Sequence, residues 1–201
     1  MRLLSKFLSL ILHPLFIPTY GTVFYFLMTP RYSPLEMQAG NILPVFILTV
    51  IIPLGSLLIL KTLGMMRSPL LLSSEERIYP LLIYLVLLLM VLLKVIPNHY
   101  TEELYYFFLG LSLATTTSLL LALTGRVISL HMVGIGSLLM FMVALSLHFE
   151  KNIVVAISLC TLACGLLASA RLFLKLHGRA AVLTGWLIGM VSQLILIQFW
   201  L

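Results

Sequence analysis

Two histidines and an arginine stand close to apolar runs, in a chain that is otherwise mostly apolar. His177 follows Arg171 by six residues, and His131 precedes Arg171 by 40. Burying an ionisable side chain costs several kcal/mol unless the group is paired or functional. An imidazole can serve as nucleophile or acid near neutral pH, and a guanidinium can hold two phosphate oxygens. These three residues are therefore catalytic or binding candidates, although each alone could be a loop residue reaching toward lipid headgroups.

Further polar residues stand where we expect helices to begin. Ser129 lies two residues before His131, and Ser73 with Glu76 fits a capping box just before Arg77. Helix starts attract phosphate, because their backbone N–H groups are free and the helix dipole is positive there. The candidate phosphate-binding residues are Arg77, Ser129 and Arg171, and the possible auxiliary residues are Glu76, Arg126 and Arg67.

The composition is that of a membrane protein. The chain is 62% hydrophobic and 9% charged, with a mean hydropathy of +1.18, which excludes an ordinary soluble domain. Apolar runs of about 18 to 22 residues recur, each long enough to cross a bilayer core of about 30 Å. We expect an all-α integral membrane bundle of six to seven transmembrane helices, with spans at 3–27, 42–60, 78–95, 104–123, 127–147, 153–170 and 180–201.

The first span is the least regular. His13-Pro14 and Pro18 should bend it, so part of it could lie in the membrane interface and reduce the count to six. No small-residue cleavage site follows it, so we expect it to be retained as a helix. The chain reads as a single transmembrane domain, 1–201, with N-terminal helices at 1–65 and a core at 66–201.

Threading seven spans alternately divides the charges unequally between the two sides. One side carries Arg2, Lys6, Lys61, Arg67, Arg77, Arg126, Arg171, Lys175 and Arg179; the other carries Arg31, Lys94 and Lys151. The positive-inside rule makes the richer side cytoplasmic. The net charge of +6 indicates membrane lipids and a phosphorylated substrate as partners. Nucleic acid is not expected, because the chain has no soluble basic module.

Small residues indicate where helices pack closely. Ala181, Gly185 and Gly189 recur every four residues in the last span, and Gly165 with Ser169 forms a shorter version in the sixth. Such ridges let a neighbouring helix approach.

The remaining polar residues have simpler interpretations. Cys160 and Cys164 read as packing residues, because their spacing suits neither a disulfide nor, without nearby His or acidic residues, a metal site. His13 reads as an interfacial or packed residue, and His148 as a solvated loop residue. The Thr/Ser run at 115–118 should hydrogen-bond to its own helix or a neighbour, or else line a cavity.

The order of these polar residues resembles the type 2 phosphatidic acid phosphatase superfamily. Its first motif is Lys-x6-Arg-Pro, where Arg77 matches the arginine while Leu70 and Ile78 replace the lysine and proline. Its second is Pro-Ser-Gly-His, where Ser129 and His131 match and apolar residues replace the proline and glycine.

The third motif of that superfamily is Ser-Arg-x5-His-x3-Asp. Arg171 and His177 match it with the spacing intact, whereas Ala170 and Ala181 replace the serine and aspartate. The resemblance covers roughly residues 77–189.

The resemblance implies a metal-independent phosphatase without a cofactor. His177 would be the nucleophile that forms a phosphohistidine, and His131 would protonate the leaving oxygen. Arg77 and Arg171 would clamp the phosphoryl oxygens, with Ser129 assisting. The substrate would be a lipid phosphate or diphosphate, and the setting a bacterial inner membrane.

Two alternatives stay open because of the departures from the motifs. Ala181 cannot orient the nucleophilic histidine, and Glu76 is the nearest substitute, while Arg67 or Arg126 could replace the lysine. The chain could instead be a catalytically weak or inactive lipid-phosphate-binding protein, or an unrelated membrane scaffold or transporter.

Overall fold

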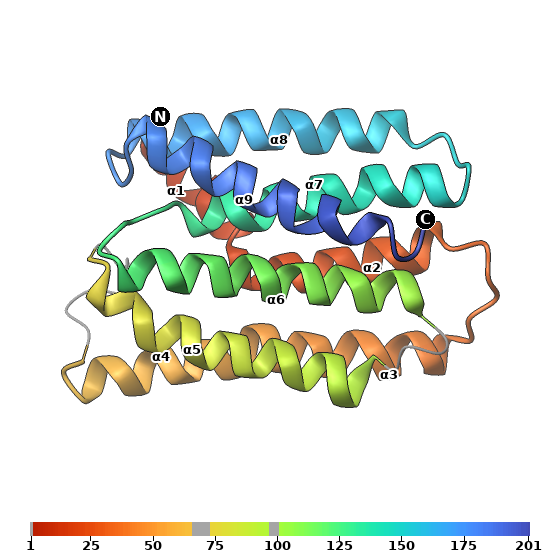
Figure 1. Cartoon of the computed structure of the whole chain (residues 1–201), viewed down its shortest axis with the longest axis horizontal. Coiled ribbons are helices and arrows are strands. Elements are labelled where there is room, and N and C mark those ends of the chain that lie inside the picture. The colour runs from red at the N-terminus through yellow and green to blue at the C-terminus, as the bar shows by residue number, and fades with distance from the viewer. Residues whose placement is uncertain (1, 66–72, 97–100) are drawn as a thin grey trace.

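The computed structural model describes residues 2–65, 73–96 and 101–201, and this part of the chain is helical, without a strand. Seven stretches are long and apolar enough to cross a membrane, which confirms the expected multi-span bundle. Figure 1 shows most of the helices lying side by side along one long axis. The elements in order are α1 (Arg2–Ile11), η1 (Pro14–Phe16), α2 (Ile17–Met28), α3 (Leu35–Phe46), η2 (Ile47–Ile51), α4 (Ile52–Thr62), α5 (Glu75–Met90), η3 (Val91–Val95), α6 (Glu102–Leu123), α7 (Leu130–His148), α8 (Val154–Phe173) and α9 (Arg179–Ile197).

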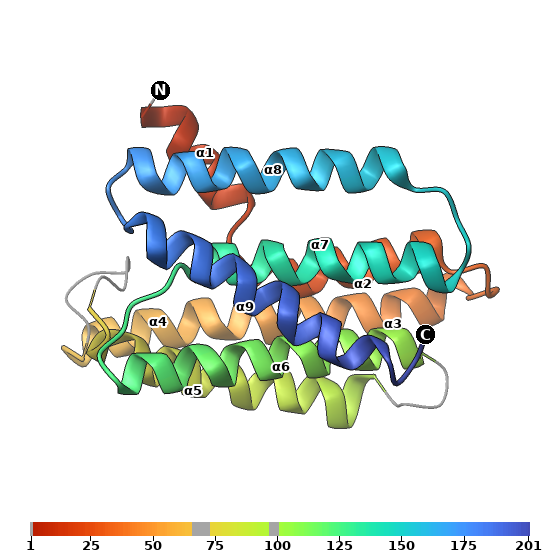
Figure 2. The same cartoon turned by 45° about the horizontal axis from the view of Figure 1, so that its top comes forward.

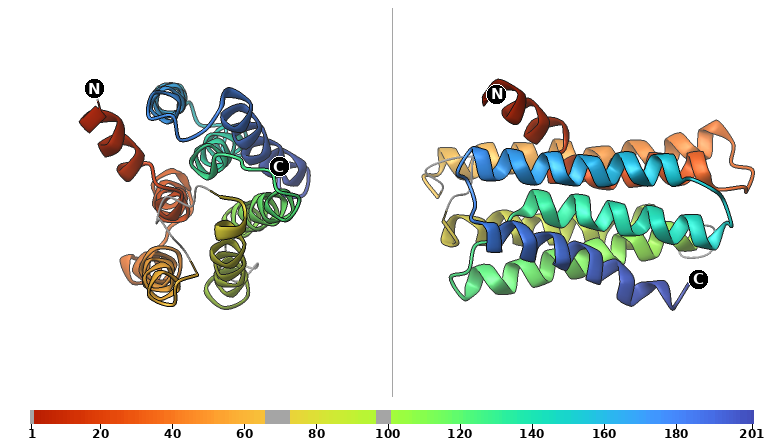
Figure 3. Two further views of the ribbon diagram at one scale, coloured as in Figure 1. Left: turned by 90° about the vertical axis from the view of Figure 1, so that its left-hand side faces the viewer. Right: turned by 90° about the horizontal axis from the view of Figure 1, so that it is seen from above.

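The first span is broken at His13. This residue has extended backbone angles, as expected for a residue that precedes a proline. Its ring Nδ1 accepts a hydrogen bond from the Leu15 N–H at 3.4 Å. Pro18, in contrast, lies in the first turn of α2 and produces no second break, because a proline is tolerated there. As a result α1 runs crosswise to the other helices instead of continuing α2 (Figures 2 and 3).

The centre of the bundle is formed by α6 and α7, which are the most buried of the spans. The rings of Phe107 on α6 and Phe141 on α7 stack with centroids 4.2 Å apart, and both side chains are fully buried. The outer helices present leucine and valine side chains on their surfaces. In a membrane this apolar surface faces lipid.

Close packing of α9 against α7 confirms one of the two predicted ridges. A Cβ atom at Gly189 would lie 2.1 Å from the carbonyl oxygen of Val133, and one at Gly185 would lie 2.6 Å from that of Ser129. The prediction for the sixth span was wrong, because a Cβ at Gly165 would meet nothing within 4 Å. A small residue on a lipid-facing surface therefore gave the same sequence signal as one at a contact.

The connections alternate between the two ends of the bundle, as the threading predicted (Figure 1). The α6–α7 and α8–α9 connections share the end where α4 finishes and α5 begins. This is the end predicted to be rich in cations. The α2–α3 and α7–α8 connections lie at the opposite end.

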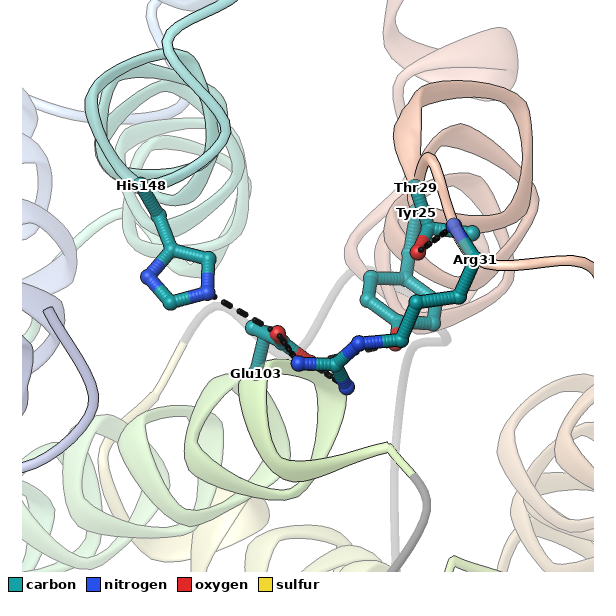
Figure 4. A network of polar contacts seen from close by, with 5 residues as sticks. All are labelled: Tyr25, Thr29, Arg31, Glu103 and His148. Atoms are coloured by element: carbon teal, nitrogen blue, oxygen red, sulfur yellow. Dashed lines mark hydrogen bonds and ion pairs between the residues drawn. The ribbon is translucent and has the colours of Figure 1, made fainter.

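That opposite end is held by a cluster around Glu103, which is 1% exposed. Arg31 Nη2 lies 3.0 Å from one carboxylate oxygen, and His148 Nε2 lies 3.0 Å from the same oxygen. The Tyr25 hydroxyl donates to the other oxygen at 3.1 Å, and Figure 4 shows the three side chains converging. His148 is therefore not the solvated loop residue that was predicted, because the buried carboxylate needs donors around it.

Candidate active site

A cavity of about 650 Å³ opens at the cation-rich end of the bundle. Its size falls in the range of pockets that hold small-molecule ligands. Side chains from α1, α4, α5, α6, α7 and α8 line it, so the N-terminal helices contribute to the site as well as the predicted core. Four of the predicted site residues are among them: Arg77, His131, Arg171 and His177.

His177 is positioned by the way α8 ends. Lys175 adopts a positive φ of 53°, and its N–H donates to the carbonyl of Leu172, while the N–H of Leu176 donates back to that of Arg171. This is the Schellman pattern that reverses a chain after a helix. It brings His177 back over Arg171, which explains why a separation of six residues can place both side chains in one site.

The imidazole of His177 contacts two guanidinium groups. Arg77 Nη2 lies 3.1 Å from its Nε2, and Arg171 Nη2 lies 3.4 Å from its Nδ1. Both arginine side chains are buried, with 3% and 5% exposure. Arg77 is anchored by a further hydrogen bond that its Nη1 donates to the carbonyl of Ile128. The site therefore joins the first turn of α5, the last turn of α8 and the connection that leads into α7.

The two guanidiniums offer His177 more N–H donors than its imidazole has acceptor nitrogens. A guanidinium carries only N–H donors, and a neutral imidazole has one acceptor nitrogen and one N–H. In one of the two arginine contacts at His177, an arginine N–H must therefore face the ring N–H, so no hydrogen bond can form there. An anion between the groups would relieve this, because its oxygens could accept from both guanidiniums and from the ring N–H.

The surroundings also keep His177 neutral. Burial, followed by the charges of Arg171 and Arg77, lowers its pKa from 6.5 to about 4, while a hydrogen bond with the Ile128 backbone acts in the opposite direction. A neutral ring has the lone pair that a nucleophile needs. The geometry thus gives His177 the protonation state that attack on phosphorus requires.

His131 lies in the first turn of α7 and contacts α1. Its Nε2 is 3.1 Å from the carbonyl oxygen of Ser9. The ring of His13 packs edge-on against it, with centroids 5.0 Å apart. Both histidines line the cavity together with His177.

Other predicted site residues lie outside the cavity lining. Ser129 is fully buried and its hydroxyl has no hydrogen-bond partner among the described residues. The Ser129 N–H donates to the carbonyl of Ala181 at 3.0 Å. Because the backbone of Ser129 is extended, α7 begins at Leu130, and the fifth span is shorter than predicted. Arg126 is exposed on the α6–α7 connection. Glu76 is half-buried in the first turn of α5, with its N–H 3.4 Å from the Ser73 hydroxyl. Arg67 lies outside the described residues.

The structure adds three basic residues that the sequence pattern did not place in the site: Arg2, Lys6 and His13. The first two were treated only as topology signals, and His13 as a packed residue. A signal was present, because Arg2, Lys6 and Ser9 follow helical spacing and share one face of the first ten residues.

The charge of the cavity is one-sided. Four cations line it, Arg2, Lys6, Arg77 and Arg171, and none of its described lining residues is acidic. The Nε of Arg171 is buried without a hydrogen-bond partner among the residues described. Apolar side chains such as Leu81, Leu111 and Leu130 form much of the remaining wall. The cavity therefore suits a ligand with an anionic head and an apolar body.

Comparisons of this chain with protein-family models, with curated proteins and with solved structures found no match. Within the described residues, no group of three or more His, Cys, Asp or Glu side chains is placed to hold a metal ion.

Proposed function

We propose that this protein is a membrane-embedded phosphatase that removes a phosphate from a lipid phosphate or diphosphate through a phosphohistidine on His177. The observation that carries the proposal is the neutral imidazole of His177 held between Arg77 and Arg171. It lines a cavity that combines cations with apolar side chains. The seven candidate spans support a multi-pass membrane protein, and we assign it to a bacterial inner membrane as part of the same proposal.

In the first step the phosphoryl group would enter between the two guanidiniums. Arg77 and Arg171 would neutralise its oxygens, since phosphoryl transfer depends mainly on positioning and charge stabilisation. The lone pair of His177 would form the new N–P bond while the P–O bond to the lipid breaks. His131 would take up a proton when the anionic substrate enters the cation-lined cavity, and would then give that proton to the leaving oxygen and become neutral.

In the second step water would hydrolyse the phosphohistidine. Neutral His131 would accept a proton from the attacking water, an O–P bond would form, and the N–P bond would break. Inorganic phosphate would leave, and His177 would regain its lone pair. The cycle thus restores both histidines and consumes only water and the lipid phosphate.

The decisive experiment is phosphate release by the purified protein from a panel of lipid phosphates, with and without a chelator. The panel comprises phosphatidic acid, phosphatidylglycerophosphate, an isoprenoid diphosphate and a lipid A phosphate. A rapid quench with labelled substrate should trap label on the protein that survives base and is lost in acid, as expected for phosphohistidine. The label should be absent from His177→Asn. Turnover that persists in His177→Asn would overturn the proposal.

One observation favours a second candidate, a lipid-phosphate-binding protein with weak or no turnover. Ala181 stands where the resembled superfamily has an aspartate, and no acidic residue among the described cavity lining replaces it. Saturable binding of a lipid phosphate without release from any member of the panel would support this function. Absence of both binding and release would leave a scaffold or transporter.

A further inference from the structure

Helix α1 has two chemically distinct faces. Arg2, Lys6 and Ser9 follow each other at helical spacing and all line the cavity. Leu3, at 83% exposure, and Phe7, at 59%, do not line it. A ten-residue helix with this division is typical of a helix that lies in the membrane interface.

Specific contacts hold α1 at the cavity. The carbonyl oxygen of Ser9 lies 3.1 Å from Nε2 of His131, and the Tyr20 hydroxyl donates to the carbonyl of Ile11 at 3.0 Å. The helix also packs against α8 and runs crosswise to the bundle (Figure 3). Its polar face is therefore a wall of the site and its apolar face is directed to the surrounding lipid.

The cations on this wall are separate from the reaction centre. Arg77 and Arg171 already contact both nitrogens of His177. Arg2 and Lys6 come from a different element and bring two more positive charges to the exposed side of the cavity, whose described lining has no acidic residue. Like charges in one cavity repel each other. A ligand that compensates all four needs negative charge at a second position, beyond the phosphoryl group at His177.

We propose that α1 is the headgroup-recognition wall of the site, where Arg2 and Lys6 bind a second anionic group and favour lipid diphosphates over monophosphates. This inference rests on the proposed function for the identity of the ligand. The apolar face of α1, embedded in the interface, holds the two cations at the depth of the headgroups. Substrate selection is thereby assigned to the N-terminal helix, and phosphoryl transfer to α5, α7 and α8.

Binding distinguishes this inference from the proposed function. The His177→Asn protein, in which turnover is blocked, is titrated with farnesyl phosphate and farnesyl diphosphate in detergent. Adding Arg2→Gln and Lys6→Gln should weaken diphosphate binding about tenfold, equivalent to about 1.4 kcal/mol. Monophosphate binding should change by less than about twofold, because the two substitutions remove only the charge-assisted hydrogen bonds to the second anion.

A matched pair of substitutions controls for a general decrease in charge. Lys61→Gln with Arg179→Gln neutralises two exposed cations that do not line the cavity, and this pair should leave both affinities unchanged. The exchange Arg2→Lys with Lys6→Arg should keep diphosphate preference, and retained monophosphate binding by the Gln pair shows that its weaker diphosphate binding is not misfolding. Equal weakening for both ligands, or the same weakening in the control pair, would overturn the inference. Absence of phosphate release by the wild type would contradict the proposed phosphatase activity but not the proposed binding role of Arg2 and Lys6.

Discussion

The protonation of His177 couples the candidate site to solution pH. Its pKa of about 4 follows from burial and from the charges of Arg171 and Arg77. In the unfolded chain the same imidazole titrates near 6.5. Folding therefore releases a proton from His177 at a pH between these two values. A bound anion would offset the arginine charges and raise the pKa of His177 again.

This coupling predicts acid sensitivity. Between pH 6.5 and about 4 the unfolded state carries a proton on His177 that the native state lacks, so stability falls as the pH drops through this window. The melting temperature of the wild type should decrease over that range, and His177→Gln should remove part of the decrease. Melting curves at several pH values in detergent provide the measurement.

Added phosphate supplies the control for this interpretation. An anion bound between the arginines raises the pKa of His177 toward its ordinary value, so saturating phosphate should flatten the pH dependence of wild type and leave that of His177→Gln unchanged. Identical slopes for the two proteins, with and without phosphate, would show that other groups cause the acid sensitivity.

A second prediction concerns Ala181, which is one helical turn beyond His177 and half-buried. A carboxylate there could accept a hydrogen bond from the imidazole and stabilise the charged phosphohistidine. Loss of the orienting carboxylate in a serine triad costs about four orders of magnitude, and the effect here should be smaller because the imidazole is itself the nucleophile. Ala181→Asp should raise kcat by at least about tenfold, and His177→Ala should abolish the gain.

The alternative role of Ala181 is packing, since its carbonyl accepts the Ser129 N–H and it precedes Gly185 on the contact ridge. Fast turnover by wild type, with Ala181→Asp only lowering the melting temperature, would assign it that role. Glu76→Gln would then be the next variant to test as the source of the missing carboxylate.

At the level of the elements, the sequence predicted the identity of the helices better than their ends. The spacing of Arg171 and His177 was informative because a Schellman turn after α8 preserves their proximity. The position of the Ser129 backbone was not predictable, because its N–H donates to the carbonyl of Ala181 on a different helix. The place of α1 at the cavity was missed, because the helical spacing of Arg2 and Lys6 indicates a shared face but not whether that face meets a cavity or lipid headgroups.

The contact of α9 with α7 gives a third prediction. A Cβ at Gly189 would approach the Val133 carbonyl to 2.1 Å, so the helices must separate in Gly189→Ala. Overpacking of this kind costs about 1–3 kcal/mol, measurable as a lower free energy of unfolding. Gly165→Ala is the matched control, because a Cβ there meets nothing within 4 Å, and it should be neutral or slightly stabilising. Equal effects of both substitutions would contradict the assignment of Gly189 to the contact.

For the molecule as a whole, alternation of apolar spans predicted the architecture and the unequal charge of the two ends. The Glu103 cluster was not predicted, because its partners Tyr25, Arg31 and His148 are separated by long stretches of chain. Only the tertiary arrangement of α2, α6 and α7 brings them together. The two ends therefore have different roles, one with donors that satisfy a buried carboxylate and one with cations in an open cavity.

The fourth prediction tests the role of that cluster. Glu103→Gln removes the charge that Arg31 and His148 contact, and should lower the free energy of unfolding by about 1–3 kcal/mol, as for loss of a charged hydrogen-bonding group. Phosphate binding at the other end should be unaffected. Glu102→Gln changes the neighbouring, exposed carboxylate and should have little effect on stability. Comparable destabilisation by the two variants would show that the loss comes from removing negative charge at the start of α6 and not from breaking the Glu103 cluster.

The fifth prediction is the orientation of the whole bundle. The nine-to-three distribution of cations places the cavity on the cytoplasmic side by the positive-inside rule, whereas the resembled superfamily usually places its site outside. Gly178→Cys, at an exposed position beside His177, should react with an impermeant thiol reagent only after cells are permeabilised, in a background with Cys160 and Cys164 changed to alanine. Ready labelling of intact cells would show that the cations were selected as phosphate ligands and not as topology signals.

The break at His13 has a consequence for the bilayer itself. The first candidate span runs from Arg2 to Met28, but because α1 turns aside, only its α2 part runs along the bundle. That part has 12 residues, which span roughly 18 Å at 1.5 Å per residue. A hydrocarbon layer of about 30 Å is too thick for such a segment, and lipids respond to hydrophobic mismatch by thinning locally. The bilayer beside α1 and α2 should accordingly be locally thinner. A lipid that enters this thinner region would have its headgroup closer to the level of the cavity.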